Sequence, residues 1–191
     1  MKKIILITGG QRSGKSTKAE QLALSLSSNP VYLATAHVWD DEFRLRVQKH
    51  QERRGPEWTN IEEEIHLSKH NLSGRVVVID CVTLWLTNLI SIEHETSLAV
   101  PSDQAERDIL GEAKRQSRAE HYLAQAKAEF DAFTAPDATY IFVTNEIGSG
   151  GVSTNALQRR FTDLQGWMNQ YIAQKADEVI LMVSGIPVKI K

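Results

Sequence analysis

The feature that most constrains the fold is an apolar run followed by a glycine-rich loop near the N-terminus. Residues 4–7 are Ile-Ile-Leu-Ile and predict a buried strand. From residue 15 to about residue 27, apolar side chains recur at helical spacing. The loop between them fits the pattern G-x-x-x-x-G-K-[ST], which holds the phosphates of a nucleoside triphosphate. Its members are Gly9, Gly10, Gln11, Arg12, Ser13, Gly14, Lys15 and Ser16.

Each residue type in this loop has a physical role. Gly9 and Gly14 permit backbone conformations that turn N–H groups toward the phosphates, and the helix N-terminus adds partial positive charge. We expect Lys15 to reach the β and γ phosphates and the Ser16 hydroxyl to bind Mg²⁺. Asp80 ends the apolar run of residues 75–80 and fits the carboxylate that holds the metal's water shell. The sequence therefore predicts a site for a magnesium nucleotide.

The rest of the chain alternates between apolar runs and amphipathic segments. Strands are predicted at residues 31–34, 75–80, 139–144 and 177–183, and helices at about 40–53 and 154–176. One face of the last helix carries the apolar residues Leu157, Phe161, Leu164, Met168 and Ile172. Nearly continuous apolar strands separated by helices predict an α/β, P-loop NTPase-like fold of three layers with a mostly parallel central sheet. Residues 184–191 predict a turn and a last strand, antiparallel at the sheet edge. At 191 residues, we expect one domain spanning 1–191.

One polar segment, residues 91–135, interrupts this alternation. We interpret it as a loop or helical extension followed by a helix that returns to the sheet with Ala126, Phe130 and Phe133 on one stripe. It is a substrate lid, an oligomer contact or a solvated connector, and the residues leave these alternatives open.

Composition excludes some classes of partner. The net charge of −2 provides no basic field for nucleic acid or an anionic membrane surface. Cys81 is the only cysteine, and no run approaches the roughly 18 apolar residues of a membrane span. The first apolar run is also too short for a signal sequence. We expect a cytoplasmic protein without membrane insertion.

The type of nucleotide chemistry depends on the region after the second strand. Residues 144–147 are Thr-Asn-Glu-Ile, where a guanine-selective switch carries N-K-x-D, so a simple GTPase switch is disfavoured. His50 shares a helical stripe with Phe43, Val47 and Arg54, and Arg53 is also close to it in the sequence. A neutral imidazole there either packs in the structure or attacks phosphorus and becomes a phosphoramidate. The residues alone leave both readings open.

Six segments together resemble one enzyme family. In chain order they are "ITGGQRSGKSTKAE", "VYLATA", "DDEFRLRVQKHQERRGPEW", "VVVIDCVTLWLTNL", "FVTNEIGSGGV" and "VSGIPVKIK". They resemble the bifunctional adenosylcobinamide kinase and adenosylcobinamide-phosphate guanylyltransferase of cobalamin biosynthesis, over nearly the whole chain apart from residues 91–135. The resemblance implies that ATP or GTP phosphorylates adenosylcobinamide. GMP then passes from GTP to adenosylcobinamide phosphate through a covalent GMP-histidine intermediate.

The resemblance also implies site residues and partners. Residues 46–50 match the R-[IV]-Q-x-H context of the family's guanylylated histidine, which makes His50 the nucleophile beside Lys15 as the second catalytic residue. Mg²⁺ would bind Ser16 and Asp80. The substrates would be adenosylcobinamide, its phosphate, GTP and ATP, and relatives are homotrimers with the corrinoid site between subunits. Nucleotide contacts would fall on Gly9, Gly10, Gln11, Arg12, Ser13, Gly14, Lys15, Ser16, Thr35, Ala36, His37, Gln51, Glu52, Arg53, Arg54, Glu62 and Asp80.

This chain departs from some relatives at two positions. Some relatives have Glu in place of Asp80 and a second histidine in place of Lys49. Two other functions remain as alternatives. One is a P-loop small-molecule kinase without a covalent step, in which His50 only packs. The other is a nucleotide-gated regulatory protein that binds a partner through residues 91–135.

Overall fold

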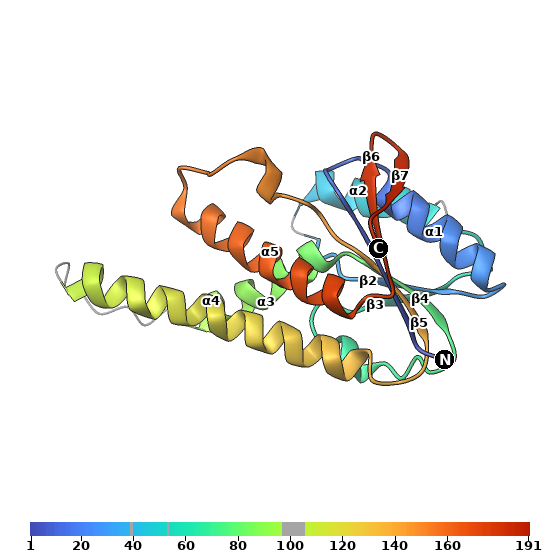
Figure 1. Cartoon of the computed structure of the whole chain (residues 1–191), viewed down its shortest axis with the longest axis horizontal. Helices are drawn as coiled ribbons and strands as arrows, with labels where there is room; N and C mark the ends of the chain where they lie inside the picture. The colour runs from blue at the N-terminus through green and yellow to red at the C-terminus, as the bar shows by residue number, and fades with distance from the viewer. Residues whose placement is uncertain (39, 53, 97–105) are drawn as a thin grey trace.

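The computed structural model describes the backbone of residues 1–38, 40–52, 54–96 and 106–191. It describes the side chains of all these residues except 43, 46, 49, 50, 92–96 and 106–117. Strands and helices alternate along most of the chain (Figure 1). The strands are β1 (Lys3–Gly9), β2 (Val31–Ala34), β3 (Thr59–Glu62), β4 (Val76–Asp80), β5 (Thr139–Val143), β6 (Glu178–Val183) and β7 (Ile186–Lys189). The helices are α1 (Lys15–Leu26), α2 (Asp41–Glu52), α3 (Val82–Thr96), α4 (Glu106–Phe133) and α5 (Ala156–Lys175), with short 3₁₀ turns η1 (Leu67–Lys69) and η2 (Gly148–Gly150).

The strands form one seven-stranded sheet in the order β3-β2-β4-β5-β1-β6-β7. Every neighbouring pair is parallel except β6 and β7, which are antiparallel. The predicted α/β fold with a mostly parallel sheet and an antiparallel last strand at the edge is therefore confirmed. Because parallel strands end on the same side, β1, β2 and β4 bring the P-loop, residue 35 and Asp80 to one edge of the sheet.

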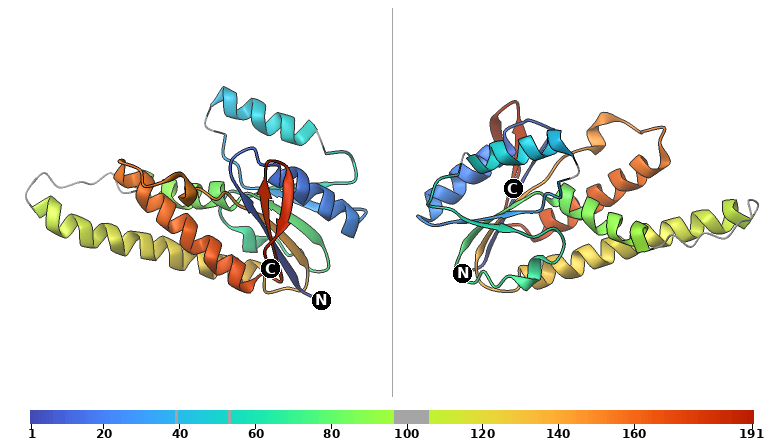
Figure 2. Two further views of the ribbon diagram at one scale, coloured as in Figure 1. Left: turned by 45° about the horizontal axis from the view of Figure 1, so that its top comes forward. Right: turned by 180° about the vertical axis from the view of Figure 1, so that it is seen from behind.

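Helices cover both faces of the sheet (Figure 2). On one face, Trp85 of α3, Phe130 of α4 and Met168 of α5 pack into one buried cluster with the strands. On the other face, Ala19 and Ala23 of α1 pack into a second cluster. Alternate side chains of the apolar strands enter the two clusters, which explains why these strands read as continuous apolar runs.

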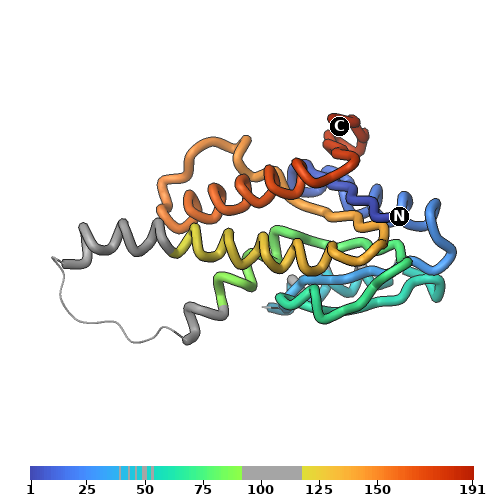
Figure 3. Tube along the Cα trace, turned by 60° about the horizontal axis from the view of Figure 1, so that its bottom comes forward, coloured from blue at the N-terminus to red at the C-terminus, as the bar shows by residue number. Residues whose placement is uncertain are grey.

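The polar segment 91–135 contains the end of α3 and all of α4, while residues 97–105 lie outside the described residues. The stripe predicted for its last part is confirmed, because Ala126, Phe130 and Phe133 are all buried. This part of α4 runs beside α5 (Figure 3). Among the described helices, none is long and apolar enough to cross a bilayer.

Four details differ from the sequence-based expectations. Strand β3 was not predicted, because its alternating half-buried and exposed residues at the sheet edge form no apolar run. No helix was predicted directly after β4, where α3 begins at Val82. Helix α2 ends at Glu52, so Arg54 lies beyond the helical stripe on which it was placed. Leu157, expected on the buried face of α5, is 58% exposed because only the later turns of that helix reach the core.

Candidate functional site

The P-loop joins the end of β1 to the start of α1. Its glycines adopt the predicted special conformations, with φ of 147° at Gly9 and 94° at Gly14. A Cβ at Gly9 would lie 2.5 Å from the carbonyl oxygen of Met182 in β6. The turn between β6 and β7 also contacts the loop, because the Gly185 N–H donates to the Ser13 carbonyl at 3.0 Å. The last segment of the chain therefore supports the shape of the phosphate loop.

The polar side chains of the loop are arranged for phosphate. Lys15 is buried, and its Nζ donates to the Gly10 carbonyl at 2.6 Å. Burial lowers the pKa of Lys15, although nearby Cys81 and Asp80 oppose that shift. The Ser13 hydroxyl is buried without a hydrogen-bond partner among the described residues. An anion in the loop would satisfy both groups, since both are donors.

Asp80 lies at the end of β4, as predicted. Its Oδ2 accepts a hydrogen bond from the Tyr32 hydroxyl at 2.6 Å, and its backbone carbonyl accepts from the Thr35 N–H at 3.1 Å. Within the described part of the chain, no hydrogen bond engages its Oδ1 or the Ser16 hydroxyl. Carboxylate and hydroxyl oxygens are ligands that Mg²⁺ prefers, so these two residues fit the expected metal.

A compact aromatic and cationic cluster adjoins Asp80. Tyr32 is only 3% exposed, and the guanidinium carbon of Arg54 lies 3.7 Å from the centroid of its ring. Trp58 meets the same ring edge-on at 5.8 Å, and Arg54 Nε donates to Asn60 Oδ1 at 2.8 Å. Burial and the neighbouring Asp80 raise the pKa of Tyr32 well above its ordinary value. The phenol therefore stays protonated and can only donate to the carboxylate.

Helix α2 carries His50 and stands apart from the sheet (Figure 2). All of its described side chains except Val47 are exposed. Near its end, Gln51 Nε2 donates to Glu62 Oε1 of β3 at 3.1 Å, which brings two predicted nucleotide contacts together. The side chain of His50 lies outside the described residues, as does Arg53 altogether. Their predicted roles therefore stay predictions.

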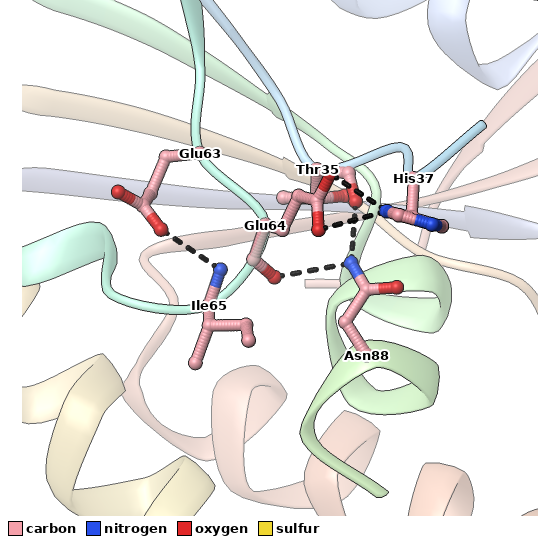
Figure 4. Close-up of polar contacts among 6 residues, drawn as sticks. All are labelled: Thr35, His37, Glu63, Glu64, Ile65 and Asn88. Atoms are coloured by element: carbon pink, nitrogen blue, oxygen red, sulfur yellow. Dashed lines mark hydrogen bonds and ion pairs between the residues drawn. The ribbon is translucent and has the colours of Figure 1, made fainter. Parts of the chain in front are cut away.

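The residues after β2 are held by α3 and by the segment that follows β3 (Figure 4). Asn88 Nδ2 donates to the carbonyls of Thr35 at 2.8 Å and Glu64 at 3.1 Å. His37 Nδ1 lies 2.9 Å from Glu64 Oε1. The Thr35 side chain is fully buried, and its hydroxyl donates to the Cys81 carbonyl and accepts from the Cys81 N–H. Thr35 therefore positions the strand end through its side chain, and Asn88 is a positioning residue that the sequence did not reveal.

The glycine-rich segment after β5 begins against the P-loop. The Glu146 N–H donates to the Gly9 carbonyl at 3.0 Å, and the Asn145 N–H donates to Thr83 Oγ1 of α3 at 3.1 Å. Thr144 is buried and donates to Asn169 Oδ1 of α5 at 2.7 Å. This segment therefore runs from the nucleotide loop toward the start of α5.

A cavity of about 780 Å³ lies where that segment meets α3, α4 and α5. Its lining combines apolar side chains such as Ile90, Tyr122 and Phe161 with donors such as Gln158 and Arg160. Ser153 and Asn155, at the end of the glycine-rich segment, belong to the same lining. The sequence did not predict this cavity, because its residues come from distant segments with no common motif.

The structure joins some predicted site residues and leaves others separate. Asp80 and Arg54 are linked through Tyr32, and Gln51 is bonded to Glu62. Within the described part of the chain, Glu52 Oε1 accepts a hydrogen bond from Gln48 Nε2 of the same helix at 2.9 Å. Gln11 and Arg12 are exposed in the loop, where Arg12 has a φ of 58°. The sequence indicated no role for Tyr32, although its position two residues before the end of β2 was an available signal.

Comparison with known proteins identifies close relatives over almost the whole chain. Residues 5–190 match the family described as cobinamide kinase / cobinamide phosphate guanyltransferase. The bifunctional adenosylcobalamin biosynthesis protein CobU of Escherichia coli is 36% identical, in an alignment that covers 98% of this chain and 99% of that protein. The corresponding CobP of Pseudomonas aeruginosa is 35% identical, covering 97% and 96%. Among solved structures, the flagellar accessory protein FlaH of Methanocaldococcus jannaschii aligns with 99% of this chain and 78% of its own at 14% identity, with a TM-score of 0.44.

Proposed function

We propose, from the premise that this chain belongs to the cobinamide kinase / cobinamide phosphate guanyltransferase family, that the P-loop holds the phosphates and that helix α2 provides the histidine that accepts GMP. The chain is a bifunctional enzyme with cobinamide kinase and cobinamide phosphate guanylyltransferase activities in adenosylcobalamin biosynthesis. The observation that carries the proposal is the buried Lys15 in a glycine loop next to Asp80, with a histidine helix tethered to the same carboxylate through Tyr32 and Arg54. Which residues perform each step is our proposal.

In the kinase step, the hydroxyl of the cobinamide aminopropanol arm attacks the γ phosphorus of ATP or GTP. The new P–O bond forms as the bond to the β–γ bridging oxygen breaks. Its electron pair leaves with ADP or GDP, and the hydroxyl proton passes to water. Lys15 and the loop N–H groups stabilise charge on the phosphates. Mg²⁺, when held by Ser16 and Asp80, would neutralise further phosphate charge. Positioning and charge stabilisation account for most of the catalysis of phosphoryl transfer, so this step does not require a dedicated base.

In the transferase step, a neutral ring nitrogen of His50 attacks the α phosphorus of GTP. The N–P bond forms while the bond to the α–β bridging oxygen breaks, and its electron pair leaves with pyrophosphate. A phosphate oxygen of adenosylcobinamide phosphate then attacks the same phosphorus. The P–N bond breaks, its electron pair returns to the imidazole, and adenosylcobinamide-GDP is formed.

Other nucleophiles near the loop are less suitable. Burial raises the pKa of the Cys81 thiol to about 12, so the reactive thiolate is scarce at neutral pH. The His37 ring is held by the Glu64 carboxylate. These contacts support His50 over both residues.

The cavity between α3, α4 and α5 is our candidate for the body of the corrinoid. A corrin ring carries apolar methyl groups and peripheral amides, and the lining offers apolar surface together with guanidinium and amide donors. The segment of residues 144–155 connects this cavity to the P-loop. We keep a homotrimer and a cytoplasmic location as expectations from the resemblance.

The transferase proposal is tested by trapping the intermediate. The protein is incubated with α-labelled GTP and Mg²⁺, denatured, and examined for bound label that acid removes and alkali does not. We expect label on the wild type and on His66→Ala, an exposed histidine used as the control, and none on His50→Ala. Equal labelling of His50→Ala would rule out His50 as the nucleophile. Phosphorylation of cobinamide without any label would indicate a kinase lacking a covalent step, and a regulator would turn over no cobinamide.

A further inference from the structure

We infer that Tyr32 is a positioning residue that ties the carboxylate of Asp80 to the end of the helix that carries His50. This inference rests on the proposed function, in which Asp80 serves the metal nucleotide and His50 the transfer of GMP. One side chain makes both connections, through its hydroxyl on one side and its ring face on the other.

The first connection fixes the carboxylate. Tyr32 lies opposite Val78 in the parallel pair β2–β4, so its side chain is diagonal to Asp80 on the same face of the sheet. Its hydroxyl donates to Asp80 Oδ2 at 2.6 Å, which restrains rotation of the carboxylate. The other oxygen keeps a defined direction and remains open to a metal ion or its water. Hydrogen-bonded partners of this kind commonly orient metal-binding carboxylates.

The second connection fixes the end of α2. The Arg54 N–H donates to the Gln51 carbonyl at 3.0 Å, so the backbone at Arg54 continues directly from the helix end. The guanidinium then stacks on the Tyr32 ring at 3.7 Å. Because the described side chains of α2 are almost all exposed, contacts at the helix end contribute strongly to its position. A cation over a buried aromatic face is a suitable anchor, since desolvation strengthens the attraction.

The two connections fix the position of the His50 helix relative to the carboxylate of Asp80. The transferase step depends on this relative position, because His50 must reach the α phosphorus of the same nucleotide whose phosphates bind the metal. A displacement of about 1 Å can reduce the rate of such a reaction roughly 100-fold. Arg54 Nη1 is also buried, and among the described residues it has no hydrogen-bond partner.

Tyr32→Phe separates the connections, because it removes the hydroxyl and keeps the ring under Arg54. We expect the Mg²⁺ concentration at half-maximal binding of a fluorescent GTP analogue to rise about 10-fold. Labelling of His50 at saturating Mg²⁺ should stay near the wild-type level. Tyr140→Phe is the matched control, since its hydroxyl donates to the Pro136 carbonyl near the start of β5, at the end of the parallel strands opposite to Asp80. It should leave the Mg²⁺ midpoint unchanged.

Arg54→Gln tests the second connection. We expect slower labelling of His50 by about 10-fold or more, with the Mg²⁺ midpoint unchanged. Asn60→Ala removes the acceptor of Arg54 Nε and should slow labelling in the same direction by less. In a Tyr32→Leu background, Arg54→Gln should add little, because the ring that holds the guanidinium is already lost. Circular dichroism and the thermal midpoint show that each variant is folded.

The results distinguish this inference from the proposed function. If Tyr32→Phe and Tyr140→Phe have the same Mg²⁺ midpoint, the Tyr32 hydroxyl does not orient Asp80. If the effects of Tyr32→Leu and Arg54→Gln on labelling simply add, Tyr32 does not hold the end of α2. In either case, labelling of the wild type would still support the proposed GMP-histidine intermediate. If the wild type itself is never labelled, the proposed transferase mechanism fails, while the Mg²⁺ midpoint continues to test the link to Asp80.

Discussion

At the scale of single residues, two adjacent glycines in the P-loop have very different surroundings. Gly9 has a φ of 147°, and an added Cβ would lie 2.5 Å from the Met182 carbonyl oxygen. Gly10 has no atom within 4 Å of the corresponding position. The first glycine is required by both backbone and space, whereas the second is not restricted in this way.

Gly9→Ala should destabilise the protein, whereas Gly10→Ala should not. The added methyl group at Gly9 displaces β6 or the loop, which we expect to cost about 1–3 kcal/mol of unfolding free energy. Urea unfolding measures this difference, and a fluorescent GTP analogue should bind more weakly to Gly9→Ala. Equal unfolding free energies for the two variants would contradict the close approach to Met182.

Asn88 illustrates a buried polar residue whose hydrogen bonds hold two segments. It is 4% exposed and donates to the carbonyls of Thr35 and Glu64. Asn88→Ala leaves both acceptors without this donor and should lower the unfolding free energy by about 2 kcal/mol. Asn71→Ala, at an exposed position, should lower it much less. A similar loss in both variants, measured by urea unfolding, would show that the Asn88 contacts contribute little.

At the scale of elements, α4 and α5 are joined by a polar contact at the surface. Asp131 of α4 accepts hydrogen bonds from the Tyr171 hydroxyl at 2.6 Å and from Lys175 Nζ. Partial burial would raise the pKa of Asp131, but the hydrogen bonds and the charge of Lys175 lower it on balance. The contact therefore stabilises the folded state when Asp131 is ionised.

The stabilisation from Asp131 should depend on pH. Because its pKa is lower in the folded protein, the contribution is present above the unfolded pKa of about 4 and is lost as pH falls through the folded value. At pH 7, Asp131→Asn should lower the unfolding free energy by at most about 1 kcal/mol, since the pair is partly exposed. The difference between the variant and the wild type should shrink as pH falls below about 4 and toward the lower pKa of the folded protein. Asp163→Asn, an exposed control on α5, should change the unfolding free energy little at pH 7. A difference between Asp131→Asn and the wild type that was as large in acid as at pH 7 would exclude this ion pair as the cause.

At the scale of the whole molecule, the nucleotide loop and the cavity lie at opposite ends of one segment. Residues 144–155 start with hydrogen bonds to Gly9 and Thr83 and end in the cavity lining. A substrate with a large body and a reactive arm can therefore be held at the cavity while its arm reaches the loop. The exposed Leu157 lies in the lining and offers a place to test this arrangement.

Leu157→Glu should weaken binding of cobinamide by about 10-fold or more, because it replaces apolar contact surface with a carboxylate. Binding of a fluorescent GTP analogue should be unchanged. Leu24→Glu, an exposed position on α1 at 42%, is the matched control and should alter neither affinity. The measurements are an absorbance titration with cobinamide and sedimentation velocity. Unchanged cobinamide affinity together with a smaller sedimenting species would mean that the cavity lines a contact between copies of the chain.

Much of the architecture was predictable because its signals are local. Apolar runs identified the positions of β1, β2, β4, β5 and β6, and the glycine pattern identified the loop before α1. Strand β3 escaped prediction because an edge strand needs only one buried face and its backbone partner lies in β2. Asn88 escaped because its two acceptors lie 53 and 24 residues away along the chain. Such pairings depend on tertiary contacts, which no local pattern encodes.

The sequence by itself determined the order of most strands and helices, the phosphate loop and the candidate residues for catalysis. These properties follow from side-chain periodicity and from the residue types at fixed spacing, both of which are local. Only the tertiary structure decided how Asp80, Tyr32 and Arg54 meet, because three separate segments approach one another there. Stacking and hydrogen bonding between distant residues depend on how the strands are ordered in the sheet. That order, with β2 beside β4, lets one tyrosine contact both Asp80 and Arg54, the residue that follows the end of α2.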